Sequence, residues 1–161
     1  MYWSSSVVAK LSNKIKLPPL IDNFMRGVGQ SHIDWLRSNE KRNRVAAKFN
    51  QIFDEYDVVL MPVVPTTAIQ HQQKPELPFR HIVVNGEKRN YTENMIWISV
   101  ATLLGLPSTS APVGSDSKGL PINIQIVGAP YQDKTTIKFA SLLSKHTGGF
   151  QIPPGFEPKA E

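Results

Sequence analysis

Cysteine is absent from this chain of 161 residues. Without thiols the chain forms no disulfide and offers no thiolate to a metal, and nothing in its composition points to an oxidising compartment. No apolar run approaches the ~20 residues that a membrane-spanning helix needs. The opening MYWSSSVVAK has no cationic start and no apolar run of about 7–15 residues, so a signal peptide is not expected. These absences predict a cytoplasmic protein without a membrane partner.

Motifs for metals, phosphates and cofactors are missing as well, and there is no internal repeat. His71 stands among glutamines and lacks the further ligands that a metal site requires. Thr102, Ser108 and Ser110 supply hydroxyls, but the sequence indicates no base within hydrogen-bond reach of them, as a nucleophile needs. We therefore expect no metal site and no cofactor, and structural roles for these hydroxyls.

The net charge of +5 raises the question of a nucleic-acid partner. The basic side chains are densest between Arg37 and Lys48, where Glu40 is interleaved and Asp34 precedes them, without an aromatic platform. That pattern is typical of the solvated face of a helix. We expect no nucleic-acid partner.

The region 94–128 carries the clearest pattern of elements. An apolar run of helix length ends at Gly105, a shorter run lies between Pro107 and Pro112, and residues 122–127 alternate isoleucine with amide side chains. These runs predict a helix over about 92–104, then a strand, a turn at 115–119 and a second strand that pairs antiparallel with the first or lies near it. Because the helix is apolar nearly all round, we expect it to be buried, with Trp97 in the core.

The prolines, the capping pattern and the apolar spacing of the N-terminal half predict helices. One is expected over residues 5–15, ending before Pro18 and Pro19. Ser31 and Asp34 have the spacing of a capping box, which predicts the start of the longest helix. Its second half has an apolar face at helical spacing, formed by Val45, Phe49, Ile52, Phe53 and Tyr56.

Shorter signals place the remaining elements. The apolar run 58–61 predicts a strand buried on both faces, inside the sheet. Residues 66–78 are polar and predict a surface loop, and Asn85-Gly86 predicts a hairpin within about 80–91. A last helix is expected over about 133–145, with Asp133 as its N-cap and Gly148 as a left-handed cap. Its apolar stripe is formed by Phe139, Ala140 and Leu143.

The sequence is similar to a known family in the same region. Gly105-Leu106-Pro107, then Ala111-Pro112-Val113-Gly114, then Gly119-Leu120-Pro121 leading into Ile124-Gln125-Ile126-Val127-Gly128 resembles the C-terminal part of the amidase signature family. Residues 31–36 and 56–63 upstream, and 133–137 and 148–150 downstream, extend the likeness in order over nearly the whole chain. The resemblance implies an α/β fold, a partial mixed β-sheet flanked by helices, equivalent to the C-terminal third of an amidase-signature fold.

The resemblance implies chemistry that this chain does not carry by itself. The family hydrolyses C–N amide bonds through an acyl-serine, without metal or organic cofactor. It uses a lysine, a serine in a cis peptide and a serine nucleophile, all N-terminal to the region seen here. Ser4-Ser5-Ser6 lacks the glycines of such a site and is interpreted as a helix N-cap. We therefore expect no catalytic residue and a C-terminal fragment that is inactive alone. The alternative is a binding or assembly module that completes an amidase core on another chain.

Candidate contacts follow from the same resemblance. Met95 and Trp97 are candidates to line the substrate pocket, because the resemblance implies that the family's equivalent helix lies close to the substrate channel; core packing is the favoured interpretation of both. Asn123 and Gln125 project from the face opposite the isoleucines, and as buried amides they need partners, which residues outside this chain would supply in the parent fold. We divide the chain into an N-terminal helical arm (1–27), an α/β portion (28–150) and a proline-rich tail (151–161). An open sheet edge predicts a dimer or higher oligomer.

Overall fold

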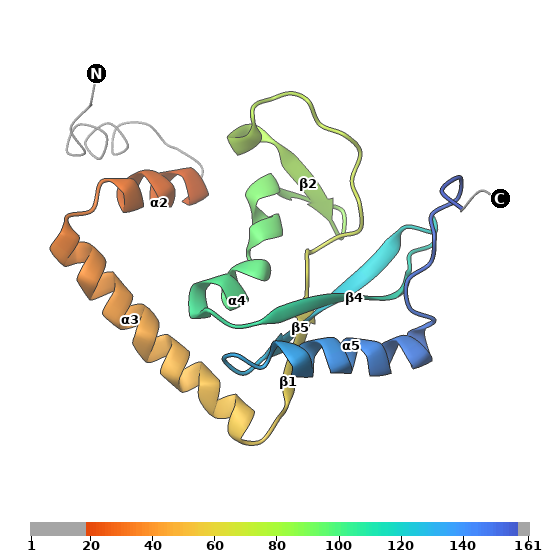
Figure 1. Ribbon diagram of the computed structural model, residues 1–161. Helices are drawn as coiled ribbons and strands as arrows, with labels where there is room; N and C mark the ends of the chain where they lie inside the picture. The colour runs from red at the N-terminus through yellow and green to blue at the C-terminus, as the bar shows by residue number, and fades with distance from the viewer. Residues whose placement is uncertain (1–18, 158–161) are drawn as a thin grey trace.

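The computed structural model describes residues 19–157, which form a three-stranded sheet, a separate two-stranded hairpin and several helices (Figure 1). The helix predicted over residues 5–15 and the cap predicted at 4–6 lie outside the described residues. Among residues 19–157, no helix combines the length and the apolar character needed to cross a membrane.

The N-terminal helices are α2 (Pro19–Val28) and α3 (His32–Asn50), and α3 continues into the short helix η1 (Gln51–Asp54). Ser31 caps α3, as predicted, because its Oγ accepts the backbone N–H of Asp34 at 3.2 Å. The carboxylate of Asp34 accepts from the Ser31 hydroxyl at 2.6 Å. The cap is therefore made by these two side chains, and it fixes where the longest helix begins.

The sheet contains β1 (Val58–Pro62), β4 (Ser108–Ser115) and β5 (Pro121–Gly128) in the order β1-β5-β4, and both pairings are antiparallel. The predicted sequence of helix, strand, turn and strand is confirmed. Asp116 holds the turn, because its Oδ1 accepts the N–H groups of Lys118 and Leu120 at 2.8 and 2.9 Å. The predicted α/β fold with a partial sheet flanked by helices is confirmed (Figure 1).

The predicted position of the first strand is wrong. β1 lies at an edge of the sheet, and its Leu60 is 49% exposed. The central strand is β5, where Ile126 and Val127 are fully buried. An apolar run indicates that a strand has side chains able to be buried. Whether the strand lies at the centre or at the edge of the sheet depends on which other strands pair with it.

The hairpin is confirmed. It consists of β2 (His81–Val84) and β3 (Glu87–Asn90), joined by Asn85 and Gly86, whose φ angles are 52° and 83°. Two successive positive φ angles are what a type I′ turn requires. The predicted surface loop before it is also confirmed, since 66–76 has no helix or strand and only the short helix η2 (Leu77–Phe79) follows.

The core lies on both faces of β5. Val127 packs with Ala101 and Leu104 of α4 (Ile98–Leu104) and with Leu106 of the turn that follows. Partly buried side chains from α3, η1, β1 and α4 pack against this cluster: Ala46, Phe49, Phe53, Met61 and Val100. On the opposite face, α5 (Asp133–Thr147) packs along β4 and β5 (Figure 1). There Thr136 is buried and shares a 2.8 Å hydrogen bond with Thr109.

The ends of α5 partly match the prediction. Gly148 has the predicted left-handed conformation, with φ 81°. Asp133 is the first helical residue and Gln132 is the N-cap, so the predicted cap was one residue late. The predicted apolar stripe is half-buried at Phe139, Ala140 and Leu143.

The helix predicted over about 92–104 forms only in its second half, and its predicted burial is wrong. The structure has the short helix η3 (Tyr91–Met95) followed by the seven-residue α4, and in α4 only Ala101 and Leu104 are buried. Trp97 is 41% exposed, so its predicted place in the core is wrong too. A segment that is apolar all round needs cover on all sides. The described residues cover only the side that faces Val127.

Candidate functional site

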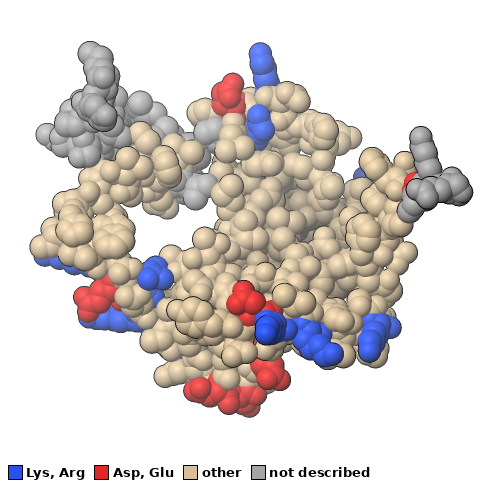
Figure 2. Space-filling model, in the orientation of Figure 1, with Lys and Arg blue, Asp and Glu red and all other residues tan. Residues whose placement is uncertain are grey.

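An exposed apolar segment extends from the end of η3 into α4. Its large side chains are 38% to 55% exposed, and they are Met95, Ile96, Trp97, Ile98 and Leu103. We call this set the docking face. In Figure 2, an opening separates the region of η3 and α4 from α2 and the start of α3. Contiguous exposed apolar patches on soluble proteins mark contact sites.

The helices across this opening carry apolar side chains of their own. The large exposed ones on α2 and the first half of α3 are Phe24, Val28, Ile33, Trp35 and Leu36. Trp35 stacks on His32, with ring centroids 6.1 Å apart. The side chain of Trp35 is 53% exposed, so this stacked pair lies at the surface.

Arg42 connects α3 to the docking face. Its Nη1 donates to the carbonyl oxygen of Leu103 at 3.2 Å, and its Nε donates to Asn39 at 3.0 Å. The last carbonyl groups of a helix lack partners inside the helix, so the guanidinium satisfies one of them. Sequence reasoning missed this contact, because no local signal joins residues 61 positions apart.

The predicted pocket residues Met95 and Trp97 lie together on the docking face. Neither lines the groove along the end of α3 or the concave sites near the loop after β1. Their contact with a substrate therefore stays a prediction, whereas their exposure is a property of the fold.

Two concave sites lie near the loop after β1. One has a volume of 420 Å³ and is lined by residues 63–68 and 121–123, mostly apolar. The other has a volume of 380 Å³ and includes His71, Arg80 and Tyr91. Arg80 donates to the carbonyl groups of Gln73 and Pro75, so its guanidinium organises the loop. Within residues 19–157, no group of three or more His, Asp or Glu side chains is arranged to hold a metal.

The predicted structural hydroxyls have no catalytic arrangement in the described chain. Thr102 Oγ1 donates to the carbonyl of Ile98 at 3.1 Å, inside its own helix. Ser108 and Ser110 are exposed on β4. Activation of a serine requires a base at hydrogen-bond distance, and no hydrogen bond of this kind involves either side chain among residues 19–157.

Gln125 is the unusual polar group of the core. It is 5% exposed, and its Nε2 has no hydrogen-bond partner among the described residues. It pairs with Met61 on β1 and Ser110 on β4, so these side chains share the face of Val127. An unpaired buried amide group costs about 1–3 kcal/mol. The predicted burial is confirmed for Gln125, whereas Asn123 is exposed.

The charges of α3 behave as a solvated face. Arg37 pairs with Asp34 at 3.2 Å and Arg44 with Glu40 at 2.6 Å, and both pairs are exposed. The pKa of Asp34 is lowered, chiefly by the hydrogen bond from Ser31 and further by Arg37. Exposed pairs of this spacing contribute little to stability.

Comparison with known proteins supplies a family. The model of the family described as Amidase matches residues 5–137. One subunit of the glutamyl-tRNA(Gln) amidotransferase of Zymomonas mobilis is 26% identical over 94% of this chain and 29% of its own length. A fatty acid amide hydrolase from Medicago truncatula is 33% identical over 71% of this chain and 18% of its own length. A bacterial aryl acylamidase of the amidase signature family shares the fold, with a TM-score of 0.60 at 18% identity, over 88% of this chain and 30% of its own. The chain thus spans less than a third of the length of each.

Proposed function

We propose that this chain, which belongs to the amidase family, supplies the C-terminal portion of an enzyme that hydrolyses C–N amide bonds. In this proposal the catalytic lysine and serines of the family belong to a preceding portion, and the residues described here only complete the fold around it. The chain is then inactive alone and needs no metal or organic cofactor. The observation that carries the proposal is the docking face.

The docking face is too apolar for a surface that stays in water. Complete burial of one large apolar side chain stabilises a fold by about 1.5–3 kcal/mol. Met95, Ile96, Trp97, Ile98 and Leu103 are each left more than a third exposed. In the matched relatives more than two thirds of the chain lies outside the region of similarity. A preceding portion that packs on η3 and α4 would bury these side chains.

The buried amide of Gln125 also supports the proposal that a further portion packs on this chain. Its buried Nε2 lacks a partner among residues 19–157, and buried polar groups in complete proteins are nearly always hydrogen-bonded. Packing of a further portion near the face shared by Gln125 and Val127 would allow the amide to find an acceptor.

Complementation tests the proposal. The residues of the Medicago truncatula relative that precede its matched region are co-expressed with this chain, tagged for purification. We expect the two to copurify and to hydrolyse a fatty acid amide, which neither does alone. Substitution Trp97→Asn on the docking face should reduce the copurified amount at least about tenfold, as for loss of a central aromatic contact.

A matched control separates docking from general damage. Tyr131 is 96% exposed and lies outside the docking face, so Tyr131→Asn should leave copurification unchanged. Equal behaviour of the two variants, or absence of any complex with wild-type chain, would contradict the proposed function.

A second candidate is a separately made assembly module that completes an amidase core on another chain. One relative is itself named as a subunit of an amidotransferase, which favours work in a multi-chain enzyme. The DNA upstream of the Met1 codon distinguishes the two. An in-frame stretch that encodes a Gly/Ser-rich segment supports one long chain, whereas a promoter and ribosome-binding site support a separate protein.

The remaining parts of the proposal concern the whole molecule. We place it in the cytoplasm, with a small-molecule amide as substrate of the complete enzyme and no nucleic-acid or membrane partner. The division of the chain at residues 27 and 150 also stays part of the proposal. Self-association is a further part of the proposal, because the outer edges of β1 and β4 pair with no other strand among the described residues.

A further inference from the structure

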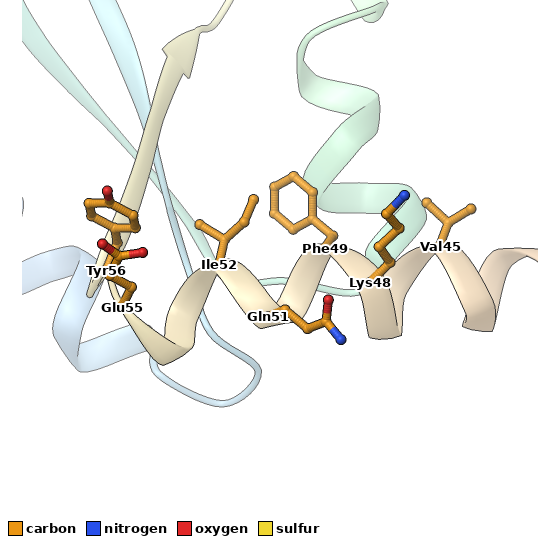
Figure 3. A pocket seen from close by; sticks show the side chains of 7 residues that line it. All are labelled: Val45, Lys48, Phe49, Gln51, Ile52, Glu55 and Tyr56. Atoms are coloured by element: carbon orange, nitrogen blue, oxygen red, sulfur yellow. The ribbon is translucent and has the colours of Figure 1, made fainter.

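A second apolar surface lies along the end of α3 and η1 and shares no residue with the docking face. Val45, Phe49, Ile52 and Tyr56 recur at helical spacing and form what we call the α3 stripe. With Lys48, Gln51 and Glu55 they line an open groove of 580 Å³ (Figure 3). Val45, Ile52 and Tyr56 are 53%, 37% and 57% exposed.

Charges are segregated along the same segment. Its first part is basic, with Lys41, Arg42, Arg44 and Lys48. Its last part is acidic, with Asp54, Glu55 and Asp57. Figure 2 shows acidic side chains gathered where α3 and η1 end in Figure 1. Within residues 19–157, Lys48 and Glu55 take part in no ion pair.

The stability of the helix itself does not explain this segregation. The C-terminal end of a helix carries partial negative charge, which disfavours acidic side chains there. The groove and the acidic end therefore suit a partner that brings positive charge to Glu55, negative charge to Lys48 and apolar side chains between them.

We propose that this partner is a second copy of the chain, packed antiparallel on the α3 stripe about a two-fold axis near Asn50 and Gln51. In that register Val45 faces Tyr56 of the other copy and Phe49 faces Ile52. Lys48 then faces Phe53 of the other copy, two residues before its Glu55, or ~4 Å along the axis at the rise of about 2.0 Å per residue of a 3-10 helix.

The pattern favours a second copy because a two-fold interface must be complementary to itself. The α3 stripe contains both members of each facing pair, at positions symmetric about its centre. A parallel arrangement would place Lys48 against Lys48 and Glu55 against Glu55, which like-charge repulsion disfavours. The segment is short, so the dimer is a small interface of the transient class.

Sedimentation velocity of the full chain over a concentration series tests the proposal. We expect a monomer–dimer equilibrium for the wild type. Lys48→Glu and Glu55→Lys should each weaken the dimer at least about tenfold, since each places like charges in both facing pairs. An equimolar mixture of the two variants should dimerise again, because the antiparallel register restores opposite charges in both pairs.

The control is Lys138→Glu, an equal charge reversal at an exposed site on α5, which should leave the dimer unchanged. Far-UV circular dichroism establishes that each variant keeps the wild-type helix content, and Ile52→Gln serves as a second variant that should also weaken the dimer. A wild type that stays monomeric overturns the proposal. So do single variants that dimerise like the wild type, or a mixture that stays monomeric. These outcomes do not bear on complementation by the docking face.

Discussion

Gly128, the last residue of β5, lies close to the first turn of α5. A Cβ at this position would lie 2.7 Å from Thr136 Cγ2 and 3.4 Å from the carbonyl oxygen of Gln132. The φ of Gly128 is outside the left-handed region, so the obstacle to alanine is steric. Thr136 is 1% exposed, and its Oγ1 donates to the carbonyl of Asp133 at 2.8 Å. We expect Gly128→Ala to lower the free energy of unfolding by about 1–3 kcal/mol, as overpacking does.

A double-mutant cycle isolates this contact. Thr136→Ser removes the Cγ2 methyl group and keeps the hydroxyl that bonds to Thr109 and Asp133. Alone it should cost about 0.5–1.5 kcal/mol, as does loss of one buried methyl group. In the double variant the added and removed methyl groups offset each other. Its free energy of unfolding in urea should exceed the additive value by about 1–2 kcal/mol.

Gly105→Ala provides the control for this cycle. Gly105 has φ 67° and open space around its missing Cβ, so alanine there meets backbone strain of roughly 1–2 kcal/mol. That cost should be the same with and without Thr136→Ser. Strict additivity of Gly128→Ala and Thr136→Ser, or full stability of Gly128→Ala, would refute the steric explanation.

Three further outcomes are expected. Asp116 has a lowered pKa, chiefly because its carboxylate accepts the backbone N–H of Leu120. The stability that results is present above the pKa of an unfolded aspartate, about 3.9, and is lost as the pH falls through the lower pKa of the folded state. Urea titrations at neutral and at acid pH should therefore show that Asp116→Asn loses less free energy of unfolding on acidification than the wild type does. Gly86→Ala, at φ 83°, should cost about 1–2 kcal/mol by the same measurement, and an unchanged midpoint would argue against the hairpin turn. The purified chain should not hydrolyse a simple aryl amide, since loss of nucleophile and base costs several orders of magnitude in rate; turnover that survives repurification and disappears in Ser108→Ala or Ser110→Ala would contradict this.

The correctly predicted features depend on short stretches of chain. The Asn85-Gly86 turn needs two residues that adopt positive φ, and both do. Ser31 caps α3 through a residue three positions away. Gly148 ends α5 with a left-handed conformation that glycine adopts without strain. Such signals act within one turn of chain, so sequence alone predicts them.

Burial could not be predicted in the same way, because it depends on what lies opposite a side chain. Leu60 belongs to an apolar run and yet lies on an edge strand. The segment around Trp97 is apolar all round, but only its inner side meets the core. The contact of Arg42 with Leu103 joins distant elements and has no local signature. The candidate site, made of such long-range relations, was therefore the least predictable part of the molecule.

The errors in predicted burial share one direction. For Leu60 and Trp97, the sequence predicts more cover than residues 19–157 provide, and Val45, Ile52 and Tyr56 of the α3 stripe are also left exposed. Gln125 shows the polar equivalent, because its buried amide lacks the partner that its environment demands. Errors from weak local signals would fall on both sides, with some residues more buried than expected. An excess of side chains that are less buried than predicted is expected where a sequence is adapted to contacts beyond its own chain. The positions of these side chains then indicate where the proposed partners bind: the docking face for the rest of an amidase fold, and the α3 stripe for a second copy.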